Sequence, residues 1–265
     1  MVEAQVSPPA AARREQILAL VDERGFAKVG ELSRRFHVSE VTVRADLDAL
    51  AEARSLVRVH GGAVAGGRPG ELERPFEQSL LAASDEKARI GRAAAGLVES
   101  GQAIVLDVGT TTTAIAAALL DRADLQNVVV ITNALNIALI LEAAIPRFTV
   151  VVTGGTLRPL QHSLVEPLAG VVLDHIRADL VFIGCSGVDV VAGVTNVNLP
   201  EADMKRRMLA TAARRIVVAD STKLGRTQLS RVAPLDGVDT LITGTECEQR
   251  QIDDLISAGL AVIRA

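Results

Sequence analysis

The stretch "LDVGTTTTAIAAAL", Leu106 to Leu119, has the pattern of a buried strand, a sharp turn and the first turns of a helix. A helix N-terminus offers unpaired N–H groups and a partial positive charge, which favour an anion. Gly109 lets the backbone approach a ligand closely, and Thr110, Thr111 and Thr112 add hydroxyl groups. Two interpretations stay open, because the same threonines could simply cap the helix.

Six further runs of β-branched and apolar residues have the same strand character: "NVVVITN", "FTVVVTGG", "DLVFIGCSG", "RIVVADS", "DTLITG" and "LAVIRA". Strands that are apolar almost throughout are buried on both faces, and helical stretches separate these runs. The sequence therefore predicts an α/β domain with a doubly wound, mostly parallel sheet. Its first helix is expected from Ser84 to Ser100, with Ser84 as the cap and Asp85 and Glu86 in the first turn.

Polar residues follow several of these strands, and the carboxyl ends of parallel strands meet at one edge, where open α/β sheets bind ligands. A ligand with a phosphate group and several hydroxyls would suit this edge, with Lys223 as the counter-charge. Each of these residues taken singly fits a turn or a helix cap. The prediction of a ligand site therefore depends on their gathering at one edge of the sheet. The candidates from strand ends are Gly109, Thr110, Thr111, Thr112, Asn133, Gly154, Gly155, Gly187, Asp189 and Lys223.

The amino-acid composition and the absence of several motifs exclude some classes of function. The 265 residues are 49% hydrophobic, carry a net charge of −4 and include neither Trp nor Tyr, so binding of single-stranded nucleic acid on stacked rings is not expected. The sequence has no apolar run of membrane-spanning length, no signal-peptide pattern and no G-x-x-x-x-G-K-[ST] motif. Cys185 and Cys247 make no metal or disulfide framework. We expect a cytoplasmic protein without metal or cofactor.

Amino-acid composition and residue patterns divide the chain into four parts. Residues 1–12 resemble a disordered tail rich in Ala and Pro, and residues 13–64 are charged and rich in helix patterns. Residues 65–80 begin with "AGGRPG" and are expected to form a linker. Residues 81–265 hold the predicted α/β domain.

The N-terminal part has the pattern of a winged helix-turn-helix. A helix is expected from Arg13 to Arg24, a second has an apolar side of Val29, Leu32 and Phe36, and Ser39 can cap a third. The third helix has an inward stripe of Val43, Leu47 and Leu50, and the alternating run "SLVRVHGGAV" predicts a hairpin wing.

The first turns of such a third helix enter the major groove of DNA. The predicted DNA-binding residues there and on the wing are Ser39, Glu40, Thr42, Arg44, Arg58 and His60. Residues 13–62 carry nine basic and eight acidic residues, so a plain helical cap with solvated charges is the alternative.

This N-terminal part closely resembles the winged helix of the DeoR family of bacterial transcriptional regulators. The family pattern V-S-x-x-T-[IV]-R-R-D-L is matched from Val38 to Leu47, and the wing pattern R-x-H-G-G-A is matched from Arg58 to Ala63. Two departures occur. Ala45 replaces the second arginine of the helix, which would weaken or retarget DNA contact, and Arg54 and Ser55 stand where a glycine usually precedes the wing.

The resemblance continues through the α/β part, in order. D-x-G-T-T-T is matched by residues 107–112, T-N by 132–133, G-G by 154–155, G-x-x-G-x-D by 184–189 and A-D-x-[ST]-K-x-G by 219–225. The family's serine-containing loop adds Ser163 as a site residue. In that loop Glu166 replaces a glycine, and its carboxylate could repel an anion or select a ligand with a cationic or hydroxyl group.

The resemblance implies a repressor of a sugar-metabolism operon. It would bind double-stranded operator DNA as a dimer or tetramer and be released by a phosphorylated sugar. The sensor domain is also similar to ribose-5-phosphate isomerase and acyl-CoA transferases, so a sugar-phosphate isomerase or transferase with an accessory helical domain is the alternative.

An isomerase needs an acid and a base, for which Asp189 and Glu201 are candidates, with Lys205 and Lys223 as cations. The isomerase's glycine-rich loop with its lysine is absent after Asp189. We therefore expect a ligand site that includes Glu201, without enzyme activity.

Overall fold

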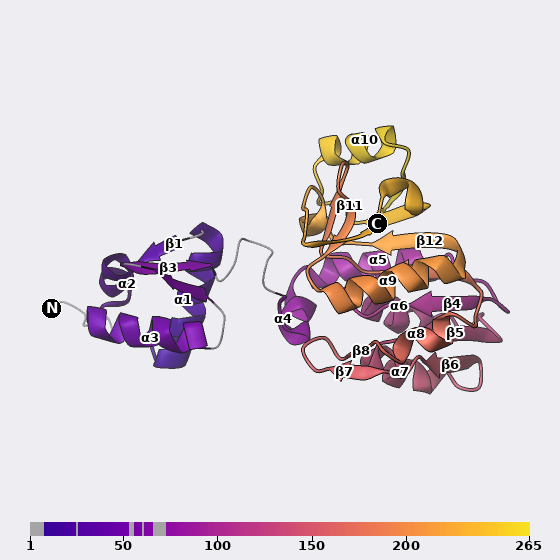
Figure 1. Cartoon of the computed structure of the whole chain (residues 1–265), viewed down its shortest axis with the longest axis horizontal. Helices are drawn as coiled ribbons and strands as arrows, with labels where there is room; N and C mark the ends of the chain where they lie inside the picture. Colours follow the sequence, from indigo (N-terminus) through magenta and orange to yellow (C-terminus); the bar gives the residue numbers. More distant parts are fainter. Residues whose placement is uncertain (1–7, 25, 53–55, 60, 66–72) are drawn as a thin grey trace. The chain divides into compact units, whose positions relative to one another are not determined.

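The computed structural model describes residues 8–24, 26–52, 56–59, 61–65 and 73–265. The chain forms two compact units, residues 1–73 and residues 74–265 (Figure 1). The division falls inside the expected linker of residues 65–80, of which residues 66–72 lie outside the described part. Residues 1–7 of the expected tail also lie outside it.

The first unit is a winged helix-turn-helix, as expected. Its helices are α1 (Ala10–Arg24), α2 (Val29–Phe36) and α3 (Glu40–Glu52). Its three-stranded antiparallel sheet has the order β1 (Phe26–Lys28), β3 (Gly62–Ala65) and β2 (Leu56–Val59). Helix α1 begins inside the segment expected to be a disordered tail, so residues 10–12 of that segment are helical.

Helix α3 begins at a serine cap. The Ser39 Oγ accepts a hydrogen bond of 3.1 Å from the Thr42 N–H, which satisfies one of the unpaired donors of the first turn. The expected inward stripe of Val43, Leu47 and Leu50 is buried, and it packs with the apolar sides of α1 and α2.

The second unit is built on a seven-stranded parallel sheet whose strands are the seven expected from the sequence. They are β4 (Ala103–Leu106), β5 (Val128–Thr132), β6 (Phe148–Val152), β9 (Ala178–Ile183), β12 (Ala212–Val218), β14 (Thr240–Thr243) and β15 (Ala261–Arg264). Their order is β15-β14-β12-β9-β4-β5-β6, so the chain winds outward in both directions from β4 and β9. The doubly wound α/β fold is confirmed.

Helices cover both faces of this sheet (Figure 1). Helices α5 (Ser84–Ala95), α6 (Thr110–Leu120) and α7 (Leu135–Leu141) share one core with Ile104, Leu106 and Phe182. Helices α8 (Ala169–Leu173), α9 (Leu199–Thr211) and α10 (Gln249–Ser257) share the other with Val105 and Val181. Successive strand residues point to opposite faces of the sheet, so each buried strand contributes side chains to both cores.

The first two helices of the second unit differ from those that the sequence predicts. Helix α4 (Phe76–Leu81) begins inside the segment of residues 65–80 expected to be a linker. Helix α5 ends at Ala95 instead of Ser100, and its cap is Ala83, with φ 51°, because Ser84 is already helical. Helix α5 packs closely on α6, since a Cβ on Gly91 would lie 2.6 Å from the Ala114 backbone.

Smaller elements sit around the sheet. A two-stranded sheet joins β7 (Thr156–Arg158) to β8 (Ser163–Val165), and a three-stranded antiparallel sheet has the order β10 (Gly187–Asp189), β11 (Gly193–Asn196) and β13 (Ser230–Ala233). The short helices are η1 (Glu142–Ala144), η2 (Ser221–Lys223) and η3 (Leu235–Gly237). No helix among the described residues is long and apolar enough to cross a membrane.

The strand order reverses direction between β4 and β9, and this pair marks the point where a doubly wound sheet binds ligands. Strand β12 lies on the far side of β9. The turns after β4, β9 and β12 therefore share one rim, and the outer two are about 10 Å apart at the usual spacing between strands.

Candidate functional site

A buried ion pair lies at the reversal point. Asp107 follows β4 directly, is fully buried, and accepts a hydrogen bond of 3.0 Å from the Gly184 N–H at the end of β9. Its Oδ2 also accepts a hydrogen bond from the ammonium of Lys205, which comes from α9 and is 2% exposed. The pair ties the turns after the two central strands to α9.

Burial controls the electrostatics of this pair. Desolvation raises the pKa of Asp107 from 3.8 to about 6, although the ammonium of Lys205 opposes the shift. For Lys205, burial by itself would lower the pKa, but the carboxylates of Asp107 and Glu201 outweigh it and raise the pKa. The Asp107 Oδ1 is buried, and no hydrogen-bond partner reaches it from the described residues.

A second buried carboxylate, Glu201, lies one helical turn from Lys205 on α9. It accepts a hydrogen bond of 2.8 Å from the hydroxyl of Ser163, which is fully buried, and another from the guanidinium of Arg158 on β7. Asn198 caps α9 by accepting the Glu201 N–H at 3.1 Å. The structure thus brings together Ser163 and Glu201, two of the predicted site residues.

The glycine-threonine turn begins α6 and uses two of its threonine hydroxyls for its own closure. Gly109 has φ 145° and ψ 162° and is the N-cap of α6. Its carbonyl accepts hydrogen bonds from the hydroxyls of Thr112 at 2.9 Å and Thr113 at 2.7 Å, so these two side chains close the turn. No hydrogen bond to the hydroxyl of Thr110 or Thr111 occurs within the described residues. These two hydroxyls and the first N–H groups of α6 are the groups available to an anion.

Lys223 supplies a positive charge at the same rim. It ends η2 after strand β12, is half-buried, and its ammonium forms no hydrogen bond or ion pair with any described residue. The positive charges of Lys223 and Lys205 both act to lower the pKa of Cys185, which lies two residues after β9. Desolvation nonetheless raises the pKa of Cys185 to about 12, so this thiol is not a nucleophile at neutral pH.

Two other predicted residues, Asn133 and Gly155, are in close contact with neighbouring parts of the chain. The Asn133 amide accepts from the Val108 N–H at 3.0 Å and donates to the Leu164 carbonyl at 3.2 Å. A Cβ on Gly155 would lie 2.4 Å from the Val165 carbonyl oxygen, whereas one on Gly154, with φ 72°, would meet nothing within 4 Å. Asn133 and Gly155 therefore shape the walls around the turn that follows β4.

Gly187 and Asp189 lie on the small antiparallel sheet. A Cβ on Gly187 would lie 2.3 Å from the Arg226 carbonyl oxygen. The two chain segments therefore lie too close together for any side chain at position 187. The Asp189 carboxylate accepts the N–H groups of Val191 and Ala192 at 2.9 Å and 2.8 Å and so closes the hairpin turn. Gly187 has no side chain, and Asp189 uses only its Oδ1 for these two hydrogen bonds.

Glu166, the departure from the family pattern, shares the guanidinium of Arg207 with Asp174. Its carboxylate forms an ion pair of 2.9 Å with Arg207 on α9. The expected repulsion of an anion, or selection of a cationic group, is therefore reduced by a guanidinium that already faces the carboxylate.

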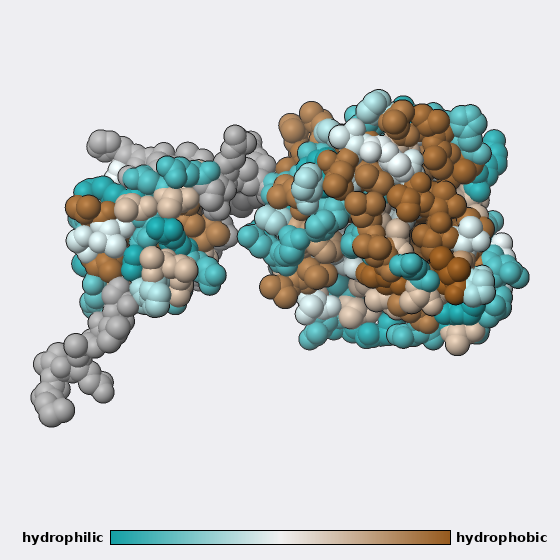
Figure 2. Space-filling model, turned by 90° about the horizontal axis from the view of Figure 1, so that it is seen from below, coloured by the Kyte–Doolittle hydropathy of each residue, from teal (hydrophilic) through white to brown (hydrophobic). Residues whose placement is uncertain are grey.

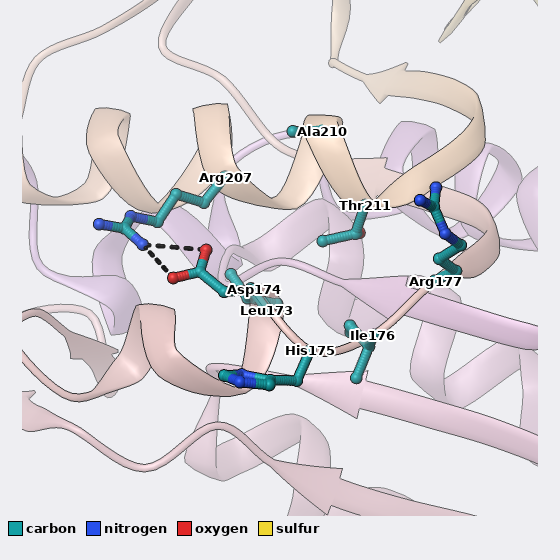
Figure 3. Close-up of a pocket in the computed structure, with 8 residues that line it drawn as sticks. All are labelled: Leu173, Asp174, His175, Ile176, Arg177, Arg207, Ala210 and Thr211. Carbon is teal, nitrogen blue, oxygen red and sulfur yellow. Dashed lines mark hydrogen bonds and ion pairs between the residues drawn. The ribbon is translucent and has the colours of Figure 1, made fainter.

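A depression of about 430 Å³ lies at the opposite edge of the sheet, where β9 and β12 begin (Figure 3). Arg207 donates to both carboxylate oxygens of Asp174, at 3.1 Å and 3.0 Å, and Arg177 lies at its far end. Open α/β sheets bind ligands at the carboxyl ends of strands, so this depression is separate from the candidate site.

The predicted DNA-binding face of α3 is exposed. Arg44 and Glu40 form an ion pair of 2.7 Å, and their side chains are 52% and 51% exposed. The hydroxyls of Ser39 and Thr42 lie 2.8 Å apart and share a hydrogen bond. Arg58 lies on β2 of the wing, where the structure describes the backbone alone, and His60 lies outside the described residues.

An unexpected cluster holds α3 against α1. Asp46, 2% exposed, accepts hydrogen bonds from the guanidinium groups of Arg13 at 2.6 Å and Arg14 at 2.9 Å. The sequence pattern assigned Asp46 only to the family motif. Its burial fixes the rotation of α3, and with it the direction of the DNA-facing side chains.

Three residues of the rim were not among the predicted ligand residues: Asp107, Arg158 and Lys205. Asp107 appeared only as the first residue of a motif, and Lys205 only as a candidate cation for isomerase chemistry. The position of Asp107 directly after a buried strand is the signal that could have identified it. Nothing in the local pattern around Arg158 indicates that it reaches Glu201.

A winged helix-turn-helix joined to a doubly wound unit with charged groups at its reversal point defines a class of helix-turn-helix regulators that sense a ligand. Residues 13–66 match the DeoR-like helix-turn-helix domain, and residues 82–245 match the DeoR C-terminal sensor domain. The chain therefore belongs to the DeoR family of transcriptional regulators.

Named relatives agree with this assignment along nearly their whole length. The HTH-type transcriptional repressor CsqR of Escherichia coli K12 is 33% identical, over 87% of this chain and 86% of the relative. GolR of Listeria innocua is 31% identical, over 94% and 96%. The glycerol-3-phosphate regulon repressor of E. coli K12 is 29% identical, over 87% and 89%. These names indicate a DNA-binding regulator rather than an enzyme.

Solved structures similar to this chain include ribose-5-phosphate isomerase A of Methanocaldococcus jannaschii. Its TM-score is 0.40 at 18% identity, and the match covers 54% of this chain and 55% of the isomerase.

Proposed function

We propose that this protein represses a sugar-metabolism operon and leaves its operator when a phosphorylated sugar binds at the reversal point of the sheet. The observation that carries the proposal is the pairing of two anion-attracting features on one rim. These are the N-terminus of α6 with Thr110 and Thr111, and the half-buried Lys223, whose ammonium has no partner among the described residues. A phosphate monoester could use both, since the turns are about 10 Å apart.

Related proteins support the ligand class. One relative is named the glycerol-3-phosphate regulon repressor, and glycerol 3-phosphate is a phosphorylated polyol. The buried Asp107 Oδ1 lacks a partner among the described residues and would accept a hydrogen bond from a ligand hydroxyl. This combination favours a hydroxylated phosphate over a simple inorganic anion.

The operator is proposed to be double-stranded DNA read by α3 in the major groove. Helix-turn-helix proteins read two half-sites as symmetric dimers, so a dimer or tetramer in the cytoplasm is proposed. Exposed apolar side chains are available for self-association on the second unit, one face of which is rich in hydrophobic residues (Figure 2). The most exposed of the large apolar side chains in this unit are Val191 at 87%, Leu81 at 82% and Leu229 at 76%.

No isomerase or transferase activity is proposed. Proton transfer at a sugar carbon needs a carboxylate free to reach it. Asp189 Oδ1 is held by two turn N–H groups, and Glu201 Oε1 by Ser163 and Arg158. Asp107 is paired through Oδ2 with Lys205, so each carboxylate would have to act through its second oxygen without leaving its present partners.

The test measures operator binding by fluorescence anisotropy during titration with glycerol 3-phosphate and ribose 5-phosphate, and with free glycerol and ribose. We expect a phosphorylated compound to lower the operator affinity and its free sugar to have little effect. A charge-assisted phosphate contact contributes about 1.5–3 kcal/mol, so Lys223→Met should raise the required ligand concentration roughly 10- to 100-fold.

Arg250→Met, which removes an equal charge from a side chain that is 90% exposed on α10, is the matched control. Equal responses to phosphorylated and free sugars would remove the phosphate site. NMR detection of an isomerised sugar in the recovered ligand would make the protein an enzyme.

A further inference from the structure

Helix α4 is the first helix of the second unit, which begins at Arg74. Its two ends are held by residues that neighbour the candidate ligand site. All of these contacts lie within the second unit.

The start of α4 is held by the turn between β7 and β8. The Phe76 ring meets His162 edge-on, with centroids 5.4 Å apart, and the Phe76 N–H donates to the Leu160 carbonyl at 3.0 Å. The carboxylate of Glu77 lies 2.8 Å from the His162 Nε2. The next residue in the chain is Ser163, whose hydroxyl binds Glu201 at the site.

The end of α4 is held by a buried lysine of α5. Lys87 is 5% exposed, and its ammonium donates to the Ser79 carbonyl at 2.5 Å and the Ala82 carbonyl at 2.6 Å. Unpaired carbonyls at the end of a helix attract a cation. Burial lowers the pKa of Lys87, the Asp220 carboxylate raises it, and the charge of Lys223 lowers it further.

The neighbouring residue on α5 faces the ligand rim. Glu86 is 5% exposed and accepts hydrogen bonds from the Ser221 N–H at 2.6 Å and the Ser221 hydroxyl at 3.1 Å. Ser221 begins η2, the turn that ends at Lys223. The first turn of α5 therefore holds α4 with one residue and the Lys223 turn with the next.

We propose that α4 transmits ligand occupancy toward the DNA-binding unit, with Lys87 and Glu86 as the positioning residues of the coupling. The proposal rests on the anion site of the proposed function. Lys87 and Lys223 are cations on two segments that Glu86 joins through Ser221, and the charge of Lys223 disfavours the ammonium form of Lys87. An anion at Lys223 therefore favours the ammonium that donates to the Ser79 and Ala82 carbonyls of α4. By linkage, a firmly docked α4 favours anion binding by the same factor.

The experiment follows hydrogen exchange of amides 76–82 by mass spectrometry in the full-length protein, with and without inorganic phosphate as the probe. Lys223→Met, without ligand, removes the repulsion and should slow exchange of these amides about twofold to fivefold, as expected for a partly solvated charge pair. Phosphate should slow the same amides in the wild type and have no further effect in Lys223→Met.

Two variants of α5 sharpen the test. Lys87→Met should remove the phosphate effect on amides 76–82 while phosphate still binds, and Lys87→Arg should restore part of it. Arg92→Met changes an exposed cation of the same helix and should behave as wild type.

Failures of the two proposals are distinguishable. If the wild type binds phosphate but neither phosphate nor Lys223→Met alters exchange of amides 76–82, the α4 coupling is overturned and the anion site stands. If the wild type binds no phosphate while Lys223→Met still slows exchange, the coupling stands and the anion site is lost. Unchanged exchange without any phosphate binding rejects both.

Discussion

On the exposed face of α3, Arg44 is held by Glu40 one turn earlier, at 2.7 Å. An ion pair that is half exposed is worth at most about 1 kcal/mol, so a guanine edge can take the guanidinium from it. The ion pair orients the Arg44 side chain in the free protein, and it is weak enough to be replaced by a contact with a base.

We expect Arg44→Ala to weaken operator binding by about 1–3 kcal/mol, or roughly 5- to 150-fold, because a bidentate base contact is lost. Fluorescence anisotropy at fixed salt measures the change. Arg250→Ala, which removes an exposed guanidinium from α10 of the second unit, is the control and should leave the operator affinity unchanged. An unchanged dissociation constant for Arg44→Ala would contradict the assignment of α3 as the reading helix.

The buried Asp107 predicts a pH dependence with a definite sign. Folding raises the pKa of its carboxyl from the ordinary 3.8 to about 6, so between these pH values the folded state holds more protons than the unfolded state. The contribution of Asp107 to the free energy of unfolding therefore falls as the pH rises from about 4 to 6. The total is at most about 3 kcal/mol at 1.36 kcal/mol per pKa unit.

Chemical denaturation of the wild type and of Asp107→Asn at several pH values tests this sign. We expect the variant to gain stability relative to the wild type as the pH rises from 4 to 6, although the loss of the partner of Lys205 lowers its stability throughout. A difference that is constant over this interval would show that Asp107 titrates normally.

At the scale of elements, the close contact of α5 with α6 positions the first turn of both helices. The small residues Gly91 and Ala114 bring the backbones together, and α5 carries Glu86 and Lys87 while α6 carries the glycine-threonine turn. A larger residue at Gly91 would move one helix relative to the other.

We expect Gly91→Ala to lower the free energy of unfolding by about 1–3 kcal/mol, because the added methyl would lie 2.6 Å from backbone atoms that cannot give way easily. Urea denaturation measures the change. Gly30→Ala in α2 is the control: its methyl would meet nothing closer than 3.6 Å, and alanine favours a helix. Equal effects at the two positions would contradict the role of close packing.

At the scale of the whole molecule, repression with release by a ligand requires that operator and ligand oppose each other through the two units. If a sugar phosphate lowers operator affinity by some factor, the operator must lower ligand affinity by the same factor. Such coupling is typically about 5- to 150-fold.

We expect titration calorimetry with the free protein and with the operator-bound protein to give ligand dissociation constants whose ratio equals the ratio found for the operator by anisotropy. Sedimentation of the same samples reports the oligomeric state. Unequal ratios would indicate that the ligand also changes the oligomer and that a two-state description fails.

The sequence by itself determined the seven strands and the winged helix, because these depend on local periodicity and on β-branched runs. The ligand edge stays a prediction from the turns at strand ends. Apolar runs such as "DLVFI" must be buried on both faces, and the order of strands and helices allows few topologies. The family motifs matched the same elements. Helix boundaries were less certain, as the short α5 and the unexpected α4 show.

The tertiary structure alone decided which polar residues are free. Asn133 and Thr112 follow strands as predicted, yet hydrogen bonds to backbone groups occupy their side chains. Asp189 lies on β10 of the small antiparallel sheet, and its Oδ1 accepts two backbone N–H groups. Asp107 and Lys205 are 98 positions apart and meet only because β4 lies beside β9 under α9. Local sequence specifies where a polar side chain stands along the chain, but its partner, its burial and therefore its pKa depend on residues that folding brings from elsewhere.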